Sequence, residues 1–293
     1  MQNPTTSVTA MLSGDFQLSQ AEFDRIRELV REHTGIALSE SKRQLVYGRL
    51  SRRLRALKLA SFSEYIDLLE KGEAVELEEF TNAVTTNLTS FFREPHHFEF
   101  LGTEMLPGAI KRNAGLRRLR IWCCAASTGE EPYSIAMVLR EAQEKLHGWD
   151  VKLLATDLDS NVLAHGDRGV YGRDRFTGMA AKRVSRFFEE VQDGPGSNGD
   201  GQKLSAVDEL RQLITFKQLN LMHEWPMKGP FDAIFCRNVI IYFDKETQRA
   251  LFERMATLQR PGDFLFLGHS ESLYRVSDKY ELIGRTIYRR LPD

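Results

Sequence analysis

The sequence predicts an α/β protein. A small N-terminal all-helical domain is followed by a larger domain built on a mostly parallel sheet, which carries a small inserted β-subdomain. Two observations support this fold class. Residues 16–88 show only helical spacing of apolar side chains, whereas strand candidates alternate with helices from about residue 117 onwards. Such alternation is typical of βαβ units, whose strands are parallel. We place the larger domain at residues 89–293 and expect the polar, unpatterned residues 1–15 to be a disordered tail.

In the helical domain, two serines mark helix starts. Ser19 and Ser61 each precede a glutamate by three positions, a spacing that forms a capping box. They begin the first and third expected helices. We expect a second helix over about 40–59 and a fourth over about 73–86, because apolar side chains recur there at helical intervals.

In the larger domain, apolar stretches predict the strands of the sheet. They are LRRLRIWCCA, VKLLATD, FDAIFC, GDFLFLGH and YELIGRTIYRRL, the last of which holds one or two strands. The alternation of strand and helix candidates is interrupted at 193–202 by the glycine-rich DGPGSNGDGQ, which is typical of a long mobile loop. LITFKQL, which follows this stretch, is strand-like, and we expect residues of about 185–215 to be a small insertion that bears a hairpin.

Composition excludes several classes of protein. Lys and Arg number 40 against 41 Asp and Glu, for a net charge of -1, so no global basic field favours nucleic acid. No apolar run is long enough for membrane insertion, and the start lacks the pattern of a secretory signal. The three cysteines form no C-x-x-C pair, so neither a disulfide framework nor a zinc site is predicted. We therefore expect a reduced, cytoplasmic protein.

The turn AASTGEEPYS follows the first strand candidate. Its small residues would let a ligand approach the backbone at the carboxyl edge of the sheet, where open α/β sheets bind ligands. The G-x-G-x-x-G fingerprint is absent and two glutamates would repel a phosphate, which disfavours a nicotinamide dinucleotide. The glutamates suit a cation or the hydroxyl and amino groups of a ligand. The alternative is an ordinary strand-to-helix turn whose helix starts near Glu131 and Pro132.

Polar side chains also end two other strand candidates. Asp157 ends the second, where an acid can accept hydrogen bonds from both hydroxyls of a ribose, and Asp159 is expected to cap the next helix. Arg237 and Asn238 end FDAIFC and are followed by Tyr242, and buried polar groups there need a partner such as a ligand. The alternative is that Arg237 pairs with an acidic neighbour and Tyr242 packs in the core.

The segment TTNLTSFFREPHHF (85–98) joins the two domains. Hydrogen-bonding side chains alternate there with apolar ones, as fits a lid over a ligand the size of adenosine. The alternative is a helix boundary with a buried pair of phenylalanines. We assign no metal to His96 and His97, because adjacent histidines on a helix cannot both face one ion.

The second expected helix is strongly basic. Residues 41–60 carry seven Lys and Arg and no acid, and at 100° per residue Lys42, Arg49 and Arg53 fall in one row with Arg52 nearby. Such a face can bind nucleic acid, an anionic membrane or an acidic protein. The alternative is a solvated charged face.

Five strings together resemble the CheR family of chemotaxis receptor glutamate methyltransferases. They are KRQLVYGRLSRRLRAL, TTNLTSFFREPHHF, AASTGEEPYSIAM, FDAIFCRNVIIYFD and GHSESL, in this order between about residues 20 and 290. The resemblance implies a helical substrate-recognition domain, a Rossmann-like S-adenosylmethionine methyltransferase domain and a small β-subdomain inserted in it. It implies S-adenosylmethionine as cofactor and S-adenosylhomocysteine as product. It also implies methyl ester formation on glutamates of chemoreceptors, which tunes chemotactic adaptation.

The resemblance also assigns roles to residues. It implies that the cofactor is bound by Asn87, Thr89, Arg93, Glu130, Asp157, Asn220, Leu221, Arg237 and Asn238. It implies that Arg93 and Tyr242 are catalytic and position the methyl group and the substrate carboxylate. The acidic methylation helices of the receptor would be recognised by Lys42, Arg49, Arg52 and Arg53.

The partners and the alternatives follow from the same resemblance. In some members of the family the β-subdomain binds a pentapeptide at the C-terminus of a receptor. We expect a monomer without a metal or a nucleic-acid partner. Two other functions remain open at this point: a methyltransferase that acts on RNA, which the near-neutral charge disfavours, and a non-catalytic module that senses S-adenosylmethionine and docks on receptors.

Overall fold

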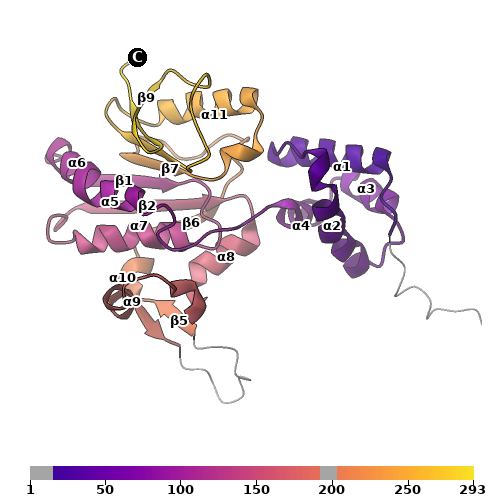
Figure 1. The fold of residues 1–293 in the computed structure, drawn as a ribbon, viewed down its shortest axis with the longest axis horizontal. Coiled ribbons are helices and arrows are strands. Elements are labelled where there is room, and N and C mark those ends of the chain that lie inside the picture. The colour runs from indigo at the N-terminus through magenta and orange to yellow at the C-terminus, as the bar shows by residue number, and fades with distance from the viewer. Residues whose placement is uncertain (1–15, 192–202) are drawn as a thin grey trace, which may run out of the picture. The chain divides into compact units, whose positions relative to one another are not determined.

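The computed structural model describes residues 16–191 and 203–293 (Figure 1). The chain divides into two compact units. The first holds the described residues up to His33 together with Ala37–Val84, and the second holds Thr34–Ile36 and Thr85–Asp293. Residues 85–88 thus cluster with the second unit. The expected tail at 1–15 and the expected loop at 193–202 lie outside the described residues.

The first unit is all helical, as predicted. Both serine caps are confirmed: the backbone N–H of Glu22 donates to Ser19 Oγ, and that of Glu64 donates to Ser61 Oγ, each over 3.2 Å. The capping box is complete at Ser19, whose own N–H donates to Glu22, whereas the Glu64 carboxylate accepts the N–H of Ala60 in place of that of Ser61. Fully buried side chains from all the α-helices form its core, which includes Phe23, Leu50, Leu54, Phe62 and Phe80. The elements are α1 (Gln20–Thr34), η1 (Glu40–Lys42), α2 (Arg43–Leu57), α3 (Phe62–Glu70) and α4 (Ala74–Val84).

The second unit contains a seven-stranded sheet in the order β6-β2-β1-β7-β8-β10-β9. The first five strands in this order pair in parallel, whereas β10 is antiparallel to both of its neighbours, so the predicted mostly parallel sheet is confirmed. The strands are β1 (Arg118–Cys123), β2 (Asp150–Asp157), β6 (Ile214–Gln218), β7 (Ala233–Cys236), β8 (Phe264–Leu267), β9 (Tyr280–Gly284) and β10 (Ile287–Arg290).

A second, three-stranded antiparallel sheet forms the predicted β-subdomain. Its order is β3 (Val170–Gly172), β5 (Lys203–Ala206) and β4 (Phe188–Glu190). The subdomain is larger than the segment of about 185–215 expected from the sequence, because it also includes β3. A strand of three residues is too short to show an alternating pattern, so no pattern predicted it. The predicted C-terminal end of the insertion is also wrong, because Ile214 and Thr215 belong to β6, which pairs with β2 in the main sheet.

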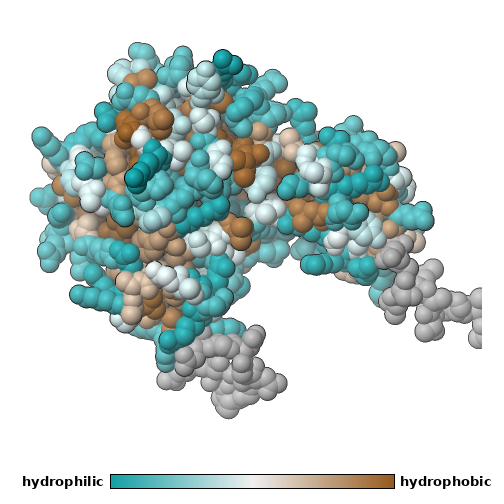
Figure 2. Space-filling view, in the orientation of Figure 1, coloured by the Kyte–Doolittle hydropathy of each residue, from teal (hydrophilic) through white to brown (hydrophobic). Residues whose placement is uncertain are grey.

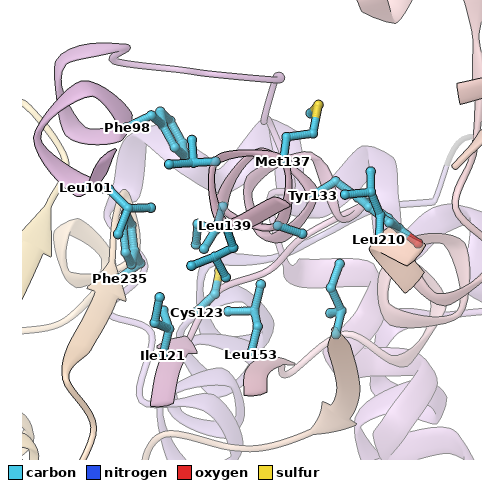
Figure 3. Packing of buried hydrophobic residues seen from close by; sticks show 14 of the residues in the cluster. Phe98, Leu101, Ile121, Cys123, Tyr133, Met137, Leu139, Leu153, Leu210 and Phe235 are labelled. Atoms are coloured by element: carbon cyan, nitrogen blue, oxygen red, sulfur yellow. The ribbon is translucent and has the colours of Figure 1, made fainter. Parts of the chain in front are cut away.

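Helices cover both faces of the main sheet, and alternate strand residues point to different cores. On β1, Ile121 and Cys123 join one hydrophobic core with helix α7, while Trp122 between them joins a second core with helix α11 (Figures 1 and 3). The helical elements of this unit are α5 (His96–Phe100), η2 (Leu101–Met105), α6 (Leu106–Arg112), α7 (Glu130–Glu141), α8 (Ser160–Arg168), η3 (Arg173–Phe176), α9 (Ala181–Phe187), α10 (Asp208–Arg211), η4 (Ile240–Tyr242) and α11 (Lys245–Thr257).

The face seen in Figure 2 is mostly hydrophilic, with separate hydrophobic patches. Within residues 16–191 and 203–293, no helix combines the length and the hydropathy that a membrane crossing requires.

Candidate active site

A cavity lies at the carboxyl edge of the main sheet, where β1, β2, β6 and β7 end. It is lined by residues that directly follow these strands and by the segment 85–93, all of them in the second unit. Such an edge is the usual ligand site of an open α/β sheet. The structure brings together nine residues that the sequence singled out: Asn87, Thr89, Arg93, Asp157, Asn220, Leu221, Arg237, Asn238 and Tyr242.

Asp157, at the tip of β2, is a buried acid of the lining and is 9% exposed. Its carboxylate accepts the backbone N–H of Ser127 over 2.8 Å and that of Asp159 over 3.1 Å. Burial raises its pKa to about 6, although both backbone donors oppose this shift. These two hydrogen bonds use about half of the acceptor capacity of the carboxylate, which offers about four lone-pair sites, so further sites are left for a ligand.

The segment 85–89 is fastened to the start of α8. Asp159 caps this helix as predicted, accepting the N–H of Asn161 over 2.9 Å, and its other oxygen accepts from the side chains of Thr85 and Asn87 over 2.7 and 2.8 Å. Ser127 Oγ donates to the carbonyl of Asn87. The side-chain amide of Asn87 is thus used within the chain, and its role is to hold the lining segment in place.

Arg237 makes the ion pairs that the alternative interpretation expected, while it also lines the cavity. Its side chain is fully buried, donates from Nη1 to Glu131 Oε2 over 2.5 Å and lies 3.4 Å from Glu94 Oε2. It also donates to the carbonyl of Arg93. A guanidinium buried between two carboxylates is held in one position, because moving it would leave unpaired buried charges. Arg237 therefore ties β7 to α7 and to the 85–94 segment.

The structure does not place Glu130 in the lining of the cavity. Its carboxylate is turned away and accepts from Thr128 Oγ1 over 2.6 Å and from Arg175, whereas the next residue, Glu131, lines the cavity. The sequence could not distinguish the two, because they are adjacent and identical. Gly129, directly before them, adopts φ +100°, and a Cβ there would lie 2.6 Å from the hydroxyl of Tyr171, so the turn that leads into α7 requires glycine.

Tyr242 reaches the cavity from η4, and Glu271 of the GHSESL string holds the chain around it. The buried Glu271 carboxylate accepts the backbone N–H groups of Gly268, Asn238 and Ile240 over 2.6 to 2.9 Å. Desolvation raises the pKa of Glu271. Among the described residues, the hydroxyl of Tyr242 has no hydrogen-bond partner, so it is available to a ligand.

Three residues around the cavity have a positive φ that L side chains rarely adopt: Phe92 at 52°, Ser127 at 49° and Asn238 at 57°. In each of them the backbone N–H donates to a buried side chain, namely Ser134, Asp157 and Glu271 respectively. Strained backbone that the surrounding contacts enforce is a common property of functional sites.

Glu94, His96 and His97 lie beside this site, with potential ligand atoms within 4.8 Å of one another. Both imidazole Nε2 atoms are 3.1 Å from the carbonyl of Arg285, and burial lowers the pKa of His97 to about 3. The guanidinium of Arg237 next to Glu94 repels a cation. We therefore assign no metal to this group.

The basic row of α2 is partly used within the helical unit. Arg53 is paired with the buried Glu76 over 2.5 Å and with Glu79 over 3.1 Å, and Arg49 donates to the carbonyl of Val84. Lys42 and Arg52 are exposed. Of the predicted row, Lys42 at the end of η1 and Arg52 in α2 are the exposed cations, whereas a partner that binds Arg49 or Arg53 has to compete with the hydrogen bond or ion pairs of that residue.

These features define a class of protein. The strand order β6-β2-β1-β7-β8 is the Rossmann order 3-2-1-4-5, and the acid at the tip of β2 stands where such domains hold a ribose, without a glycine-rich phosphate loop. The second unit is therefore a Rossmann-like domain with a site for a nucleoside.

The chain belongs to the CheR methyltransferase family. The family's S-adenosylmethionine-binding domain matches residues 87–289, and its all-alpha domain matches residues 21–85. The chain is 47% identical to chemotaxis protein methyltransferase 2 of Pseudomonas aeruginosa over 97% of this chain and 99% of that protein. It is 40% identical to the chemotaxis protein methyltransferase of Escherichia coli over 97% of this chain and 95% of that protein. The predicted family is confirmed, and with it S-adenosylmethionine as the cofactor.

The residues of the cavity fit this cofactor. The buried carboxylate of Asp157 suits two ribose hydroxyls, which donate hydrogen bonds. Leu158, Leu219 and Leu221 offer apolar contact for the adenine ring, and Asn220 offers an amide for its polar edge. Glu131 and Arg93 are charged groups of opposite sign for the amino and carboxylate ends of the methionine part.

The raised pKa of Asp157 makes cofactor binding depend on pH. Ribose hydroxyls need the ionised carboxylate as acceptor, so the affinity for S-adenosylhomocysteine is expected to fall about tenfold between pH 7 and pH 5 around a pKa of about 6. The stability of the unliganded chain changes in the opposite direction. The pKa of Asp157 in the folded chain exceeds the unfolded value of about 3.9, so protonation of Asp157 raises the free energy of unfolding as pH falls from 6 towards 4. Calorimetric titrations with S-adenosylhomocysteine across this range test the first sign, and thermal unfolding of the unliganded chain tests the second. Asp157→Asn should bind weakly at every pH, and an unchanged pH dependence in that variant would assign the titration to another group.

Proposed function

We propose that the protein transfers the methyl group of S-adenosylmethionine to glutamate side chains of chemoreceptors and forms methyl esters. The observation that carries this proposal is the joint presence of Asp157 and the unpartnered Tyr242 hydroxyl in one cavity that has no histidine or lysine among its described lining residues. A carboxylate acceptor needs no general base, whereas an amine has to lose a proton before or after it is methylated.

The proposed chemistry needs positioning and the removal of water. A glutamate with a pKa near 4.3 is already ionised at pH 7. When bound, S-adenosylmethionine would supply a methyl group on a positively charged sulfur. A carboxylate oxygen would form the new C–O bond while the C–S bond breaks. The electron pair of the C–S bond would stay on sulfur, and no proton would move. Two opposite charges are neutralised in this step, so a site with little water favours it.

The residues of the chain would then orient the acceptor. The neutral Tyr242 hydroxyl can donate to one carboxylate oxygen and leave the other free to react, which aligns the carboxylate without quenching its charge. Arg93 donates from Nη1 to the carbonyl of Leu88, so its guanidinium is held at the cavity and is available to a carboxylate of the cofactor or of the substrate. Leu88 lines the same cavity and is 79% exposed, which offers an apolar contact to the residues that flank the glutamate.

The partners follow from the charge and the subdomain. We infer that the exposed cations Lys42, directly before α2, and Arg52, in α2, attract the acidic methylation helices of the receptor, because opposite surface charges speed encounter in a salt-dependent way. The β-subdomain is the candidate site for a receptor's C-terminal pentapeptide. We further propose that the protein acts as a monomer in the cytoplasm.

Removing the two exposed cations tests the role of α2. The double variant Lys42→Ala/Arg52→Ala is expected to lower kcat/KM for the receptor about tenfold at low salt, and the difference should shrink as ionic strength rises. Its affinity for S-adenosylhomocysteine should not change. We leave Arg53 in place because its loss would unpair the buried Glu76 and destabilise the helical unit.

The control for this variant removes the same charge elsewhere. Lys111 and Lys145 are exposed lysines of the second unit, and Lys111→Ala/Lys145→Ala should methylate the receptor like the unmodified protein. Equal losses in both double variants would mean that overall charge matters and that α2 has no special role.

Transfer of a labelled methyl group tests the proposed function itself. The full chain is incubated with methyl-labelled S-adenosylmethionine and either cytoplasmic fragments of chemoreceptors or total RNA. We expect label on the receptor that alkali releases, as it does from an ester. Label on RNA would replace the proposal with an RNA methyltransferase. Normal binding of S-adenosylhomocysteine without any transfer would replace it with a cofactor-sensing module.

A further inference from the structure

We propose that Arg175 is a positioning residue for methyl transfer, which ties the cofactor-binding segment 85–93 and the start of α7 to the β-subdomain. This inference deepens the proposed function and rests on it for the transfer step. Arg175 lies in η3, directly after β3 of the subdomain, and neither its sequence context nor the family strings drew attention to it.

The contacts of Arg175 reach two walls of the cavity. Its Nη2 donates to the carbonyl of Thr89 over 2.9 Å and also to Glu130, and its Nε donates to Glu130 Oε1 over 3.1 Å. Thr89 lines the cavity, and Glu130 directly precedes Glu131, which lines it as well. One guanidinium thus connects two lining segments that are about 40 residues apart in the sequence.

The carboxylate that Arg175 binds is almost inaccessible to water. The Glu130 side chain is 1% exposed, whereas that of Arg175 is 38% exposed. The second carboxylate oxygen of Glu130 accepts from Thr128 Oγ1. The carbonyl of Thr128 accepts in turn from the hydroxyl of Tyr171 on β3. A buried carboxylate is costly without a cation, so the start of α7 depends on a residue of the subdomain.

An aromatic contact joins the same segment to the subdomain independently. Phe91 stacks on Phe176 with ring centroids 5.1 Å apart, and its edge contacts involve Tyr171 at 5.1 Å and Phe188 at 5.5 Å. These partners belong to β3, η3 and β4. Phe91 therefore anchors the segment between Thr89 and Arg93 in the subdomain. Arg175 holds the carbonyl of Thr89 next to the cavity.

The arrangement gives the subdomain an influence on the cofactor site. Movement of β3 or η3 would displace both Thr89 and Glu130, because the planar guanidinium of Arg175 is hydrogen-bonded to both residues. A ligand that docks on the subdomain and holds η3 in place would favour the cofactor-binding geometry by the same route.

Replacing Arg175 tests this inference by binding. Arg175→Ala is expected to raise the Kd for S-adenosylhomocysteine at least about tenfold, because it removes one partner of a buried, hydrogen-bonded ion pair. The matched control is Arg173→Ala, which removes the same side chain from the same element, where Arg173 pairs with Glu190 and both side chains are more than half exposed. The control should bind within about twofold of the unmodified protein.

A second variant separates positioning from simple neutralisation of Glu130. In Arg175→Ala/Glu130→Gln no buried charge is left unpaired, but the contact to Thr89 is still missing. We expect its Kd to remain raised, and we expect Arg175→Lys, which can reach only part of this network, to fall between the alanine variant and the unmodified protein. A single cooperative thermal unfolding transition of each variant in the absence of ligand shows that the fold persists, and Arg175→Ala should unfold at a lower temperature than the double variant because its Glu130 is unpaired.

Either of two results would overturn the inference: binding by Arg175→Ala within about twofold of the unmodified protein, or recovery of normal binding when Glu130→Gln is added. Failure of the proposed function would look different. In that case the unmodified protein would bind S-adenosylhomocysteine normally and leave receptor glutamates unmethylated, while the order of affinities among the Arg175 variants would still stand.

Discussion

Asp157→Ala is expected to weaken the binding of S-adenosylhomocysteine about a hundredfold. In the proposed cofactor site the carboxylate would accept two ribose hydroxyls, and hydrogen bonds to a charged group contribute about 1.5 kcal/mol or more each. Two of them correspond to about 3 kcal/mol, or a factor of about 10² in Kd. The variant also frees the backbone N–H of Ser127, which holds a turn at φ 49°. Isothermal titration calorimetry measures the change directly.

A matched acid provides the control for this variant. Asp167 is exposed on α8, the helix that follows Asp157, and Asp167→Ala should bind S-adenosylhomocysteine like the unmodified protein. If Asp157→Ala bound with nearly normal affinity, the tip of β2 would not be the ribose site, and the cofactor would have to be placed elsewhere.

Tyr242→Phe is expected to lower kcat about a hundredfold and to leave cofactor affinity within a factor of two or three. The substitution removes one hydroxyl and keeps the ring, so the change is limited to the orientation of the acceptor carboxylate, where misplacement of the reacting atoms costs a factor of about 10². Because Glu271 fixes the chain at Asn238 and Ile240 through their backbone N–H groups, the ring should keep its place. Steady-state kinetics with a receptor fragment gives kcat and KM separately.

Tyr274→Phe is the control for the loss of a tyrosine hydroxyl. Tyr274 is 74% exposed in the second unit and is not among the residues that line the cavity. Its variant should methylate normally. A loss of cofactor affinity in Tyr242→Phe as large as its loss of kcat would place Tyr242 in the cofactor site and remove its separate role.

The parts of the site that follow strand ends could be predicted from the sequence. Parallel strands bring their carboxyl ends to one edge, so Asp157 after β2 and Arg237 after β7 meet in one cavity once the strands are recognised. The helix caps at Ser19, Ser61 and Asp159 could also be predicted from the sequence, because a capping side chain accepts a hydrogen bond from a backbone N–H only two or three positions away.

Other features depend on contacts that a linear pattern does not contain. The two adjacent glutamates differ in their distant partners, since Glu130 accepts from Arg175 and Glu131 accepts from Arg237. Glu271 stabilises the Asn238 turn from another loop, and Arg175 reaches Thr89 across the subdomain. The ion pair of Arg53 with Glu76 could likewise not be predicted from the sequence, because periodicity places a cation on a face of a helix but does not identify its partner.

The central claim is that a carboxylate is the group that the protein methylates. Mass spectrometric peptide mapping of a chemoreceptor fragment, after incubation with the full chain and S-adenosylmethionine, tests it most directly. We predict peptides that are heavier by one methylene, with the modification on glutamate, lost in mild alkali and absent when that glutamate is replaced by alanine. A modification on lysine, arginine or a terminal amine that survives alkali would contradict the account.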